Sequence, residues 1–179
     1  MPAKRSMPLS QVYRLIEPGP VVLLSTAYAG RRNVMTQSWH TMIEFEPPLI
    51  GCIVSEANHT FTALDRSREC VISVPTVEIA AAVAGCGNTS GRKVDKFQTF
   101  GLTPEPASLV QAPRIAECYA DLECEVADAR LKSRYNLFVL RVLKAWRKPA
   151  VSAPRTLHHL GRGRFMVAGK TLTLPSRMK

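Results

Sequence analysis

The chain has 179 residues, and its 46% hydrophobic and 21% charged content is that of a globular protein, which excludes the disordered and fibrous classes. Its formal net charge of +10 favours anionic ligands. No apolar run approaches the roughly 20 residues that cross a bilayer, and the N-terminus lacks the apolar stretch of a secretory signal. We therefore expect one cytoplasmic domain over residues 1–179 that makes no membrane contact.

The first third of the chain predicts three strands. The β-branched, apolar run Val21–Ala27 is followed by a turn at Gly30 and by a second strand over Val34–Ile43, which indicates a hairpin. Proline lacks the amide donor of a ladder, so the Pro47-Pro48 pair must break regular pairing. The near-continuous apolar run Leu49–Val54 predicts a third strand that is buried on both faces.

Three short helices are expected in the middle of the chain. Thr60–Arg68 has an apolar face, with Thr60 as its N-cap. The alanine-rich run Val77–Ala84 predicts a helix that Gly85 ends. Ser90–Phe100 is expected to form a further helical piece, before an irregular connector that is punctuated by prolines.

Strands outnumber helices in this pattern, and several are joined by short turns. The remaining strand candidates are Cys70–Val74, Ala116–Val126, Tyr135–Ala145 and a shorter one at Phe165–Val167. The order favours a mainly β protein with short helices, built as an antiparallel barrel, over a doubly wound sheet. No internal repeat or domain boundary is evident.

The five cysteines are scattered without a CxxC spacing, which argues against a disulfide framework and against a zinc site. Cys52, Cys70 and Cys124 lie in apolar runs and are expected to be small buried hydrophobes. Cys86 stands between two glycines, so we expect it in a turn, as the cysteine whose reactivity is worth testing.

Several classes of site lack their motif. There is no GxxxxGK[ST] and no GxGxxG after a strand, so neither a P-loop nor a dinucleotide-binding fingerprint is present. The four histidines have no carboxylate or thiol partner at ligand spacing, which argues against a metal site and against a hydrolase triad. The basic residues are dispersed, and we do not expect nucleic acid as a partner. A non-catalytic basic barrel that binds nucleic acid or another anion is the alternative of a different class.

Three segments carry candidate binding residues. The second strand has more polar side chains than a core strand needs, which suits a flat, polar-edged ligand, and Trp39 either borders that ligand or belongs to the core. Hydroxyls and free amides in the loop Ser55–Thr60 can hold a phosphate at a helix N-terminus, although a capped helix start explains Thr60 equally well. Ser90–Phe97 carries four charges in five residues, either as a solvated face or as charge for a phosphate or a reduced flavin.

These segments together resemble the flavin reductase-like family. The matching elements are PVVLLSTAYAGRRNVMTQSW, the Pro47-Pro48 pair, NHTFTALDRSRECVISVP and SGRKVDKFQTFGLTPEPASLVQAPRIAECYADLECEV. They follow the order of the family and place the core of the domain at about 9–167. The last run is long and idiosyncratic, so it carries most of the resemblance.

The resemblance implies a homodimeric, FMN-binding split barrel with a Greek-key sheet and one flavin per subunit near the dimer interface. Residues expected along the ring and ribityl chain are Asn33, Val34, Met35, Thr36 and Ser38, with Trp39 beside them. Those expected at the phosphate are Ser55, Asn58, His59 and Thr60. Those expected in a segment that closes over the cofactor are Ser90, Lys93, Asp95 and Lys96.

Many relatives carry an arginine in the phosphate loop, where this chain has Ala57 and Asn58. The missing cation must come from Arg92, Lys93 or Lys96, or the flavin binds more weakly.

The family also implies that NADH or NADPH reduces FMN by two electrons, a step that needs no side chain as acid or base. We expect a flavin reductase, with a monooxygenase or redox protein as a further partner. A flavoredoxin-type electron carrier, reduced by a protein partner, is the alternative. A barrel recruited for haem lacks a well-placed axial ligand.

Overall fold

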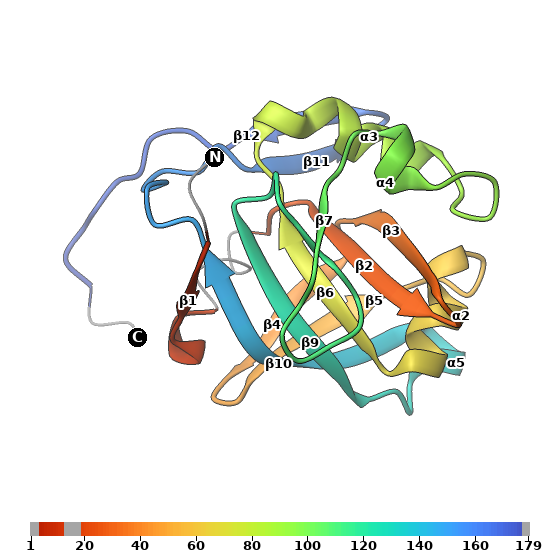
Figure 1. Cartoon of the computed structure of the whole chain (residues 1–179). Helices are drawn as coiled ribbons and strands as arrows, with labels where there is room; N and C mark the ends of the chain where they lie inside the picture. Colours follow the sequence, from red (N-terminus) through yellow and green to blue (C-terminus); the bar gives the residue numbers. More distant parts are fainter. Residues whose placement is uncertain (1–3, 13–18, 177–179) are drawn as a thin grey trace.

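The computed structural model describes residues 4–12 and 19–176, and its centre is a curled antiparallel sheet (Figure 1). The strands of this sheet are β1 (Arg5–Met7), β2 (Val22–Tyr28), β3 (Arg31–Gln37), β4 (His40–Phe45), β5 (Pro48–Ile53), β6 (Glu69–Val74), β9 (Ala120–Asp128) and β10 (Leu137–Arg147). They run in the order β3-β2-β6-β9-β10-β5-β4, with β1 on β10. The predicted domain also includes 1–3, 13–18 and 177–179, which lie outside the described residues.

Short helices and two small sheets surround the barrel. The two-stranded sheets are β7 (Pro104–Glu105) with β8 (Arg114–Ile115), and β11 (Leu157–Gly161) with β12 (Arg164–Val167). The helices are η1 (Leu9–Gln11), α2 (His59–Ser67), η2 (Val77–Ile79), α3 (Ala80–Asn88), α4 (Lys96–Thr99) and α5 (Lys132–Tyr135). Within the described ranges, none of them is long and apolar enough to cross a bilayer.

The order of the strands confirms the predicted antiparallel barrel. Hairpins such as β2–β3 alternate with pairs of strands that are distant in the chain, β2–β6 and β5–β10, as in a Greek key. The two ends of the sheet, β3 and β4, are consecutive in the chain. Gln37 Nε2 donates to Ile53 O at 2.7 Å, and Ile53 N donates to Trp39 O at 2.9 Å, so the sheet closes on itself at this point.

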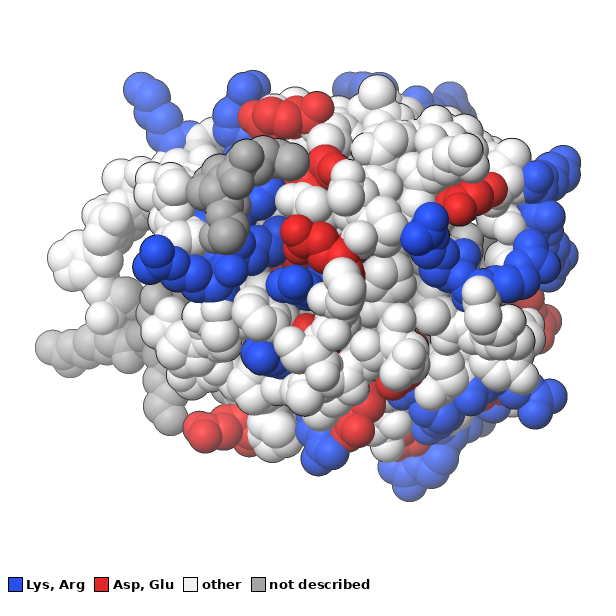
Figure 2. Space-filling model, in the orientation of Figure 1, with Lys and Arg blue, Asp and Glu red and all other residues white. Residues whose placement is uncertain are grey.

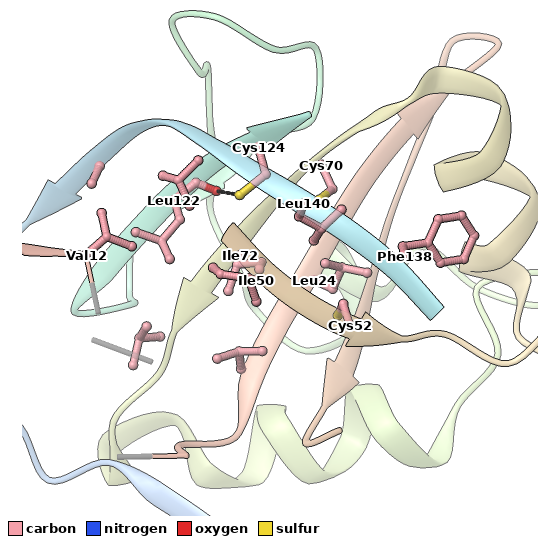
Figure 3. Packing of buried hydrophobic residues seen from close by; sticks show 14 of the residues in the cluster. Val12, Leu24, Ile50, Cys52, Cys70, Ile72, Leu122, Cys124, Phe138 and Leu140 are labelled. Atoms are coloured by element: carbon pink, nitrogen blue, oxygen red, sulfur yellow. Dashed lines mark hydrogen bonds between the residues drawn. The ribbon is translucent and has the colours of Figure 1, made fainter. Parts of the chain in front are cut away.

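Two hydrophobic cores lie on opposite faces of β2, because successive side chains of a strand point to opposite faces. The larger core fills the barrel, where Leu24, Ile72 and Leu140 pack together (Figure 3). The second core includes Leu23 and lies between the outer face of β2 and β3 and the helices α3 and α4. The second core therefore anchors α3 and α4 beside β3.

The predicted strand over Val34–Ile43 is wrong as a single element. The structure has β3 up to Gln37 and β4 from His40, with Ser38 and Trp39 between them. The reason is topological, since β3 and β4 are the two ends of the sheet and the chain must cross from one to the other. A strand pattern read locally cannot reveal such a crossing.

The boundaries of α2 and α3 also differ from the prediction. The N-cap of α2 is Asn58 and not Thr60, whose hydroxyl instead accepts from Asn33 Nδ2 at 2.9 Å. The predicted helix Val77–Ala84 begins as the 3-10 helix η2 over Val77–Ile79, and α3 continues past Gly85 to Asn88, with Gly85 packed against the ring of Phe100.

The predicted helix Ser90–Phe100 is reduced to the four residues of α4. Asp95 caps it, since its carboxylate accepts from Phe97 N at 2.9 Å and from Gln98 N at 3.3 Å. The preceding residues 90–95 form turns, which places their backbone and side chains at the surface beside β3. The irregular connector after α4 contains the small β7–β8 pair.

The cysteines are buried, as predicted for Cys52, Cys70 and Cys124. The turn predicted for Cys86 is wrong, because this residue lies inside α3 and belongs to the second core. Burial raises the pKa of the Cys86 thiol to about 11, so the reactive thiolate is suppressed at neutral pH.

Candidate functional site

A cleft of about 690 Å³ opens along β3, within the range of small-molecule sites. We call it the β3 cleft. Its walls come from β3, from the end of β5 and the loop before α2, from the end of α3, from the loop before α4, and from Asn136. Four segments that are distant in the chain therefore meet at the edge of the barrel.

Because β3 is the end strand of the sheet, its one partner among the described strands is β2, and its other edge faces the cleft. Two side-chain hydrogen bonds tie β3 to other segments: Gln37 to Ile53 at the end of β5, and Asn33 to Thr60 in α2. On the opposite face, Thr36 Oγ1 donates to Val83 O in α3 at 2.5 Å. The strand is thus held on both faces, and its free edge is available to a ligand.

The loop before α2 forms a compact turn at one end of the β3 cleft. Asn58 N donates to Ser55 O at 2.9 Å, and Ala57 N donates to Ser55 Oγ at 3.3 Å. Glu56 N donates to Asn136 Oδ1 at 3.1 Å, which ties the turn to the start of β10. Within the described part of the chain, no side chain caps the start of α2. Phe61 N donates to Asn58 O at 3.1 Å, so the amides that precede Phe61 remain available to an anion.

Positive charge converges on this turn. Burial lowers the pKa of His59 first, and the positive charges of Arg92, Arg31 and Lys96 lower it further. These three cations lie in the loop before α4, at the start of β3 and at the start of α4. Arg31 is one that the sequence did not suggest.

Lys96 is a buried cation, 5% exposed, at the wall of the β3 cleft. Its Nζ donates to Cys86 O at 2.7 Å, and burial lowers its pKa. Among the described residues it forms no ion pair with a carboxylate. A buried ammonium of this kind favours a negatively charged ligand beside it.

Two glycines allow close approach to β3. A Cβ on Gly91 would lie 2.0 Å from Asn33 Oδ1, and one on Gly87 would lie 3.4 Å from Thr36 Cβ. A side chain at Gly91 would push against Asn33, whereas one at Gly87 would make an ordinary contact with Thr36. The backbone at Gly91 therefore packs directly against β3.

The structure brings most of the predicted site residues to the β3 cleft. Those that line it are Asn33, Met35, Thr36, Ser38, Trp39, Ser55, Asn58, His59, Thr60, Ser90 and Lys96. Val34 does not, because alternation along β3 points it into the second core. Lys93 and Asp95 line a neighbouring cleft instead.

Several lining residues were missed by sequence reasoning. They are Gln37, Ile53, Ala57, Cys86, Gly87, Asn88, Thr89, Gly91 and Asn136. The run of small residues from 85 to 91 was a usable signal, because small residues permit a backbone to approach a ligand. No sequence signal pointed to Asn136, because the pairing of β5 with β10 brings this residue to the cleft.

Comparison with known proteins agrees with this geometry. Residues 13–166 match the model of the flavin reductase like domain. The uncharacterised protein YddH of Escherichia coli (strain K12) is 29% identical over 179 residues, which span 92% of this chain and 95% of that protein. The match covers both the barrel and the segments that form the β3 cleft.

Two solved structures share the fold. An FMN-binding domain of a flavin reductases-like enzyme from Shewanella baltica OS155 has a TM-score of 0.92 at 26% identity, with 97% of this chain and 98% of that chain covered. Flavoredoxin of Desulfovibrio vulgaris (Miyazaki F) has a TM-score of 0.79 at 21% identity, with 87% and 90% covered. The predicted split barrel is confirmed. The chain belongs to the flavin reductase-like domain family.

Proposed function

We propose that this protein binds FMN in the β3 cleft and reduces it with NADH or NADPH. The observation that carries the proposal is the make-up of the cleft. One end has a helix N-terminus that no side chain caps, with three cations around it, and the side is the free edge of a strand. FMN combines a phosphate dianion with a flat ring whose edge alternates hydrogen-bond acceptors and donors. Membership of the family supports the same cofactor.

A buried oxygen in the cleft provides a test of fit. Asn33 Oδ1 is buried and has no hydrogen-bond partner among the described residues, while Asn33 Nδ2 is held by Thr60. Leaving such a carbonyl unpaired costs about 1–3 kcal/mol, so a donor group of a ligand is favoured beside it. The residues present therefore fit a polyhydroxylated, phosphorylated flavin.

The phosphate would be held by the turn before α2. The amides at the start of the helix donate to it, together with the hydroxyls of Ser55 and Thr60. Arg31, Arg92 and Lys96 supply the positive charge around His59. The departure of this chain from its relatives, Ala57 and Asn58 in the loop, is thereby offset from other segments.

The ring would lie along β3, toward Ser38 and Trp39. When bound, FMN supplies the hydride-accepting chemistry, and the protein positions it and tunes its charge. Lys96 is the group placed to do the tuning, because a buried ammonium stabilises the negative charge that reduction adds to the ring. No side chain has to move a proton in the hydride transfer itself.

We also propose that two copies associate through the edge of the barrel at β4. Two large apolar side chains of β4 are exposed there, Ile43 and Phe45. β4 ends the sheet and has β5 as its one partner among the described strands, so it offers an open edge to a second chain. A dimeric mass in light scattering, reduced to the monomeric mass by Ile43→Lys, is the expected result.

An electron carrier of the flavoredoxin type is the second candidate function. The observation that favours it is Trp39, which lies on the β3 cleft and is 71% exposed, so that a protein partner has access to the site. In that case FMN binds, but neither NADH nor NADPH reduces it at a useful rate. A cytoplasmic location fits both candidates.

The absorbance spectrum of the purified protein, before and after FMN is added, tests the proposed function. We expect flavin bands that stay with the protein through gel filtration, and oxidation of NADH or NADPH that depends on FMN. Riboflavin, which lacks the phosphate, is the matched control and is expected to bind more weakly. A protein that neither retains FMN nor turns it over contradicts the proposal.

Asn58→Asp is expected to weaken FMN binding by about tenfold, since it sets a carboxylate against the phosphate dianion at the start of α2. Fluorescence titration measures the affinity. Riboflavin affinity should stay the same, because only the phosphate meets the new charge. Equal FMN affinity in the variant and the wild type would remove this turn from the site.

A further inference from the structure

A smaller pocket of about 240 Å³ opens between β3, α3 and the hairpin of β11 and β12. We call it the α3 pocket. The residues that line both this pocket and the β3 cleft are Thr36, Ser38, Gly87 and Asn88. The two spaces therefore adjoin at the end of β3, the end toward which the FMN ring would extend.

The hairpin of β11 and β12, drawn beside α3 in Figure 1, forms the outer wall of the α3 pocket. Val21 N donates to Leu157 O at 2.6 Å, which fixes β11 beside the start of β2. Leu157 is buried in the second core, and His159 follows two residues later on the same face of β11. Phe165 pairs with His159 across the hairpin, and their ring centroids are 5.3 Å apart. Two aromatic rings thus line the pocket on this side.

The floor of the α3 pocket is apolar. Val21 and Val83 line it and are 1% and 0% exposed. Gly87 lies one turn after Val83 on α3, on the same face of the helix. A Cβ at Gly87 would already contact Thr36 at 3.4 Å, so a larger side chain would fill the passage between the α3 pocket and the β3 cleft. Glycine at this position leaves that passage open.

Two polar side chains stand at the rim of the α3 pocket, Ser38 and Asn88. Both residues are exposed, and within the described part of the chain neither side chain forms a hydrogen bond. A hydroxyl and a side-chain amide can each donate to an acceptor. The rim therefore offers two donors to a ligand whose body lies on the apolar floor.

The α3 pocket has no charged partner for an ionic ligand. Among the described residues that line it, none is Lys, Arg, Asp or Glu. Basic side chains gather instead at the right-hand side of Figure 2, the side on which Figure 1 draws α2 and the loop before α4. A phosphate or carboxylate removed from water without a cation beside it costs free energy. The lining therefore suits a neutral ligand and does not suit a nucleotide.

The size of the α3 pocket limits the ligand to one ring. A cavity of about 150 Å³ with an apolar lining holds a benzene molecule. The volume of about 240 Å³ here is larger by the space of a small substituent. A flat ring can pack edge-to-face or offset against Phe165 and His159, and its substituent can then reach the rim.

We propose that the α3 pocket binds a small, neutral aromatic compound that carries one hydrogen-bond acceptor, such as a carbonyl group. The ring packs against Phe165, and Ser38 and Asn88 donate to the acceptor. Binding of this compound depends on the pocket alone, whereas its position beside the flavin rests on the proposed function.

Titration of the flavin-free protein with acetophenone, followed by NMR, tests the pocket. We expect saturable binding, and about tenfold weaker binding of benzoate, whose carboxylate has no cation to meet. Phe165→Ala should weaken acetophenone binding by about tenfold through loss of the packed ring. Met166→Ala is the matched control, because Met166 points to the other face of β12 and is 53% exposed. FMN affinity should be unchanged in both variants, since neither residue lines the β3 cleft.

A second variant separates binding from folding, because Phe165 also packs against the second core. Asn88→Ala changes an exposed side chain and should weaken acetophenone binding by about fivefold, the usual effect of one lost hydrogen bond. Thermal unfolding reports whether each variant is folded. Absence of saturable binding overturns the proposal, as does equal affinity for acetophenone and benzoate. Wild-type affinity for acetophenone in both Asn88→Ala and a folded Phe165→Ala overturns it as well.

The FMN-loaded protein tests the position of the ligand. Acetophenone is expected to shift the flavin absorbance, and Phe165→Ala should abolish the shift. Binding that leaves the flavin spectrum unchanged overturns the placement beside the ring. Failure of the proposed function is read separately, from titration with FMN. A protein that binds acetophenone through Phe165 but never binds FMN keeps the α3 pocket and loses the flavin assignment.

Discussion

Gly91→Ala is expected to weaken FMN binding by tenfold or more, which corresponds to about 1.4 kcal/mol or more. The new Cβ would lie 2.0 Å from Asn33 Oδ1 and 2.8 Å from Asn33 Cγ. Either Asn33 must leave Thr60, or the loop before α4 must move away from β3. Both responses disturb the wall of the β3 cleft, which Asn33 and Gly91 line, so FMN binding should weaken.

Fluorescence titration of Gly91→Ala with FMN measures this effect, and thermal unfolding monitors whether the variant folds. Gly169→Ala is the matched control, since a Cβ at Gly169 meets nothing within 4 Å and the residue has no left-handed φ. The control should bind FMN as the wild type does. An unchanged FMN affinity in a folded Gly91→Ala protein would show that this loop lies outside the site.

Asp121→Ala is expected to lower the free energy of unfolding by about 3–5 kcal/mol, the usual effect of removing one partner from a buried ion pair. Asp121 is 0% exposed and forms an ion pair with Lys4. It also accepts from Ser73 Oγ at 2.6 Å and from Ile115 N at 3.3 Å. The variant leaves a buried ammonium and two further donors without their acceptor.

Urea denaturation of wild type and Asp121→Ala gives the comparison, provided that the slope of the transition stays the same. Arg130→Ala is the matched control. Its ion pair with Asp128 is 2.7 Å long, but the Arg130 side chain is 89% exposed, so the expected change is below about 1 kcal/mol. A similar small change in Asp121→Ala would contradict the assigned role of the buried pair.

Local pattern predicted most elements of the barrel. The apolar run at Val21–Ala27 corresponds to β2, and the hairpin with β3 has the expected turn at Gly30, where φ is +74°. The apolar run at Leu49–Val54 corresponds to β5, which is largely buried. These elements were predictable because period and turn chemistry depend on neighbours in the chain.

Boundaries set by packing were not predictable in this way. Gly85 ordinarily signals the end of a helix, yet α3 continues past it, and the ring of Phe100 fills the space that a side chain at Gly85 would take. Lys96 was expected as part of a charged surface helix or as a cofactor ligand, and it is buried with its ammonium on Cys86 O. Gly85 contacts Phe100, and Lys96 contacts the end of α3. Both contacts join α3 to the segment around α4, so a local sequence pattern does not reveal them.

In the candidate site too, some features were predictable from the sequence and others depended on packing. The amino acid types at the turn before α2 were readable, since hydroxyls and free amides before a helix suit a phosphate. The position of Arg31 near His59 was not readable, because the fold of the barrel brings β3 beside α2. Likewise, Val34 matched the motif by position, but alternation along β3 buries its side chain in the second core.

The sequence by itself determined the mainly β class, the family and most of the polar groups of the site, since periodicity, turn residues and a long motif are local properties. Tertiary structure alone decided where the strand over 34–43 divides and which cations lie around the turn before α2. The physical reason is that strand order and burial arise from contacts between distant segments. No local pattern encodes which segments those are.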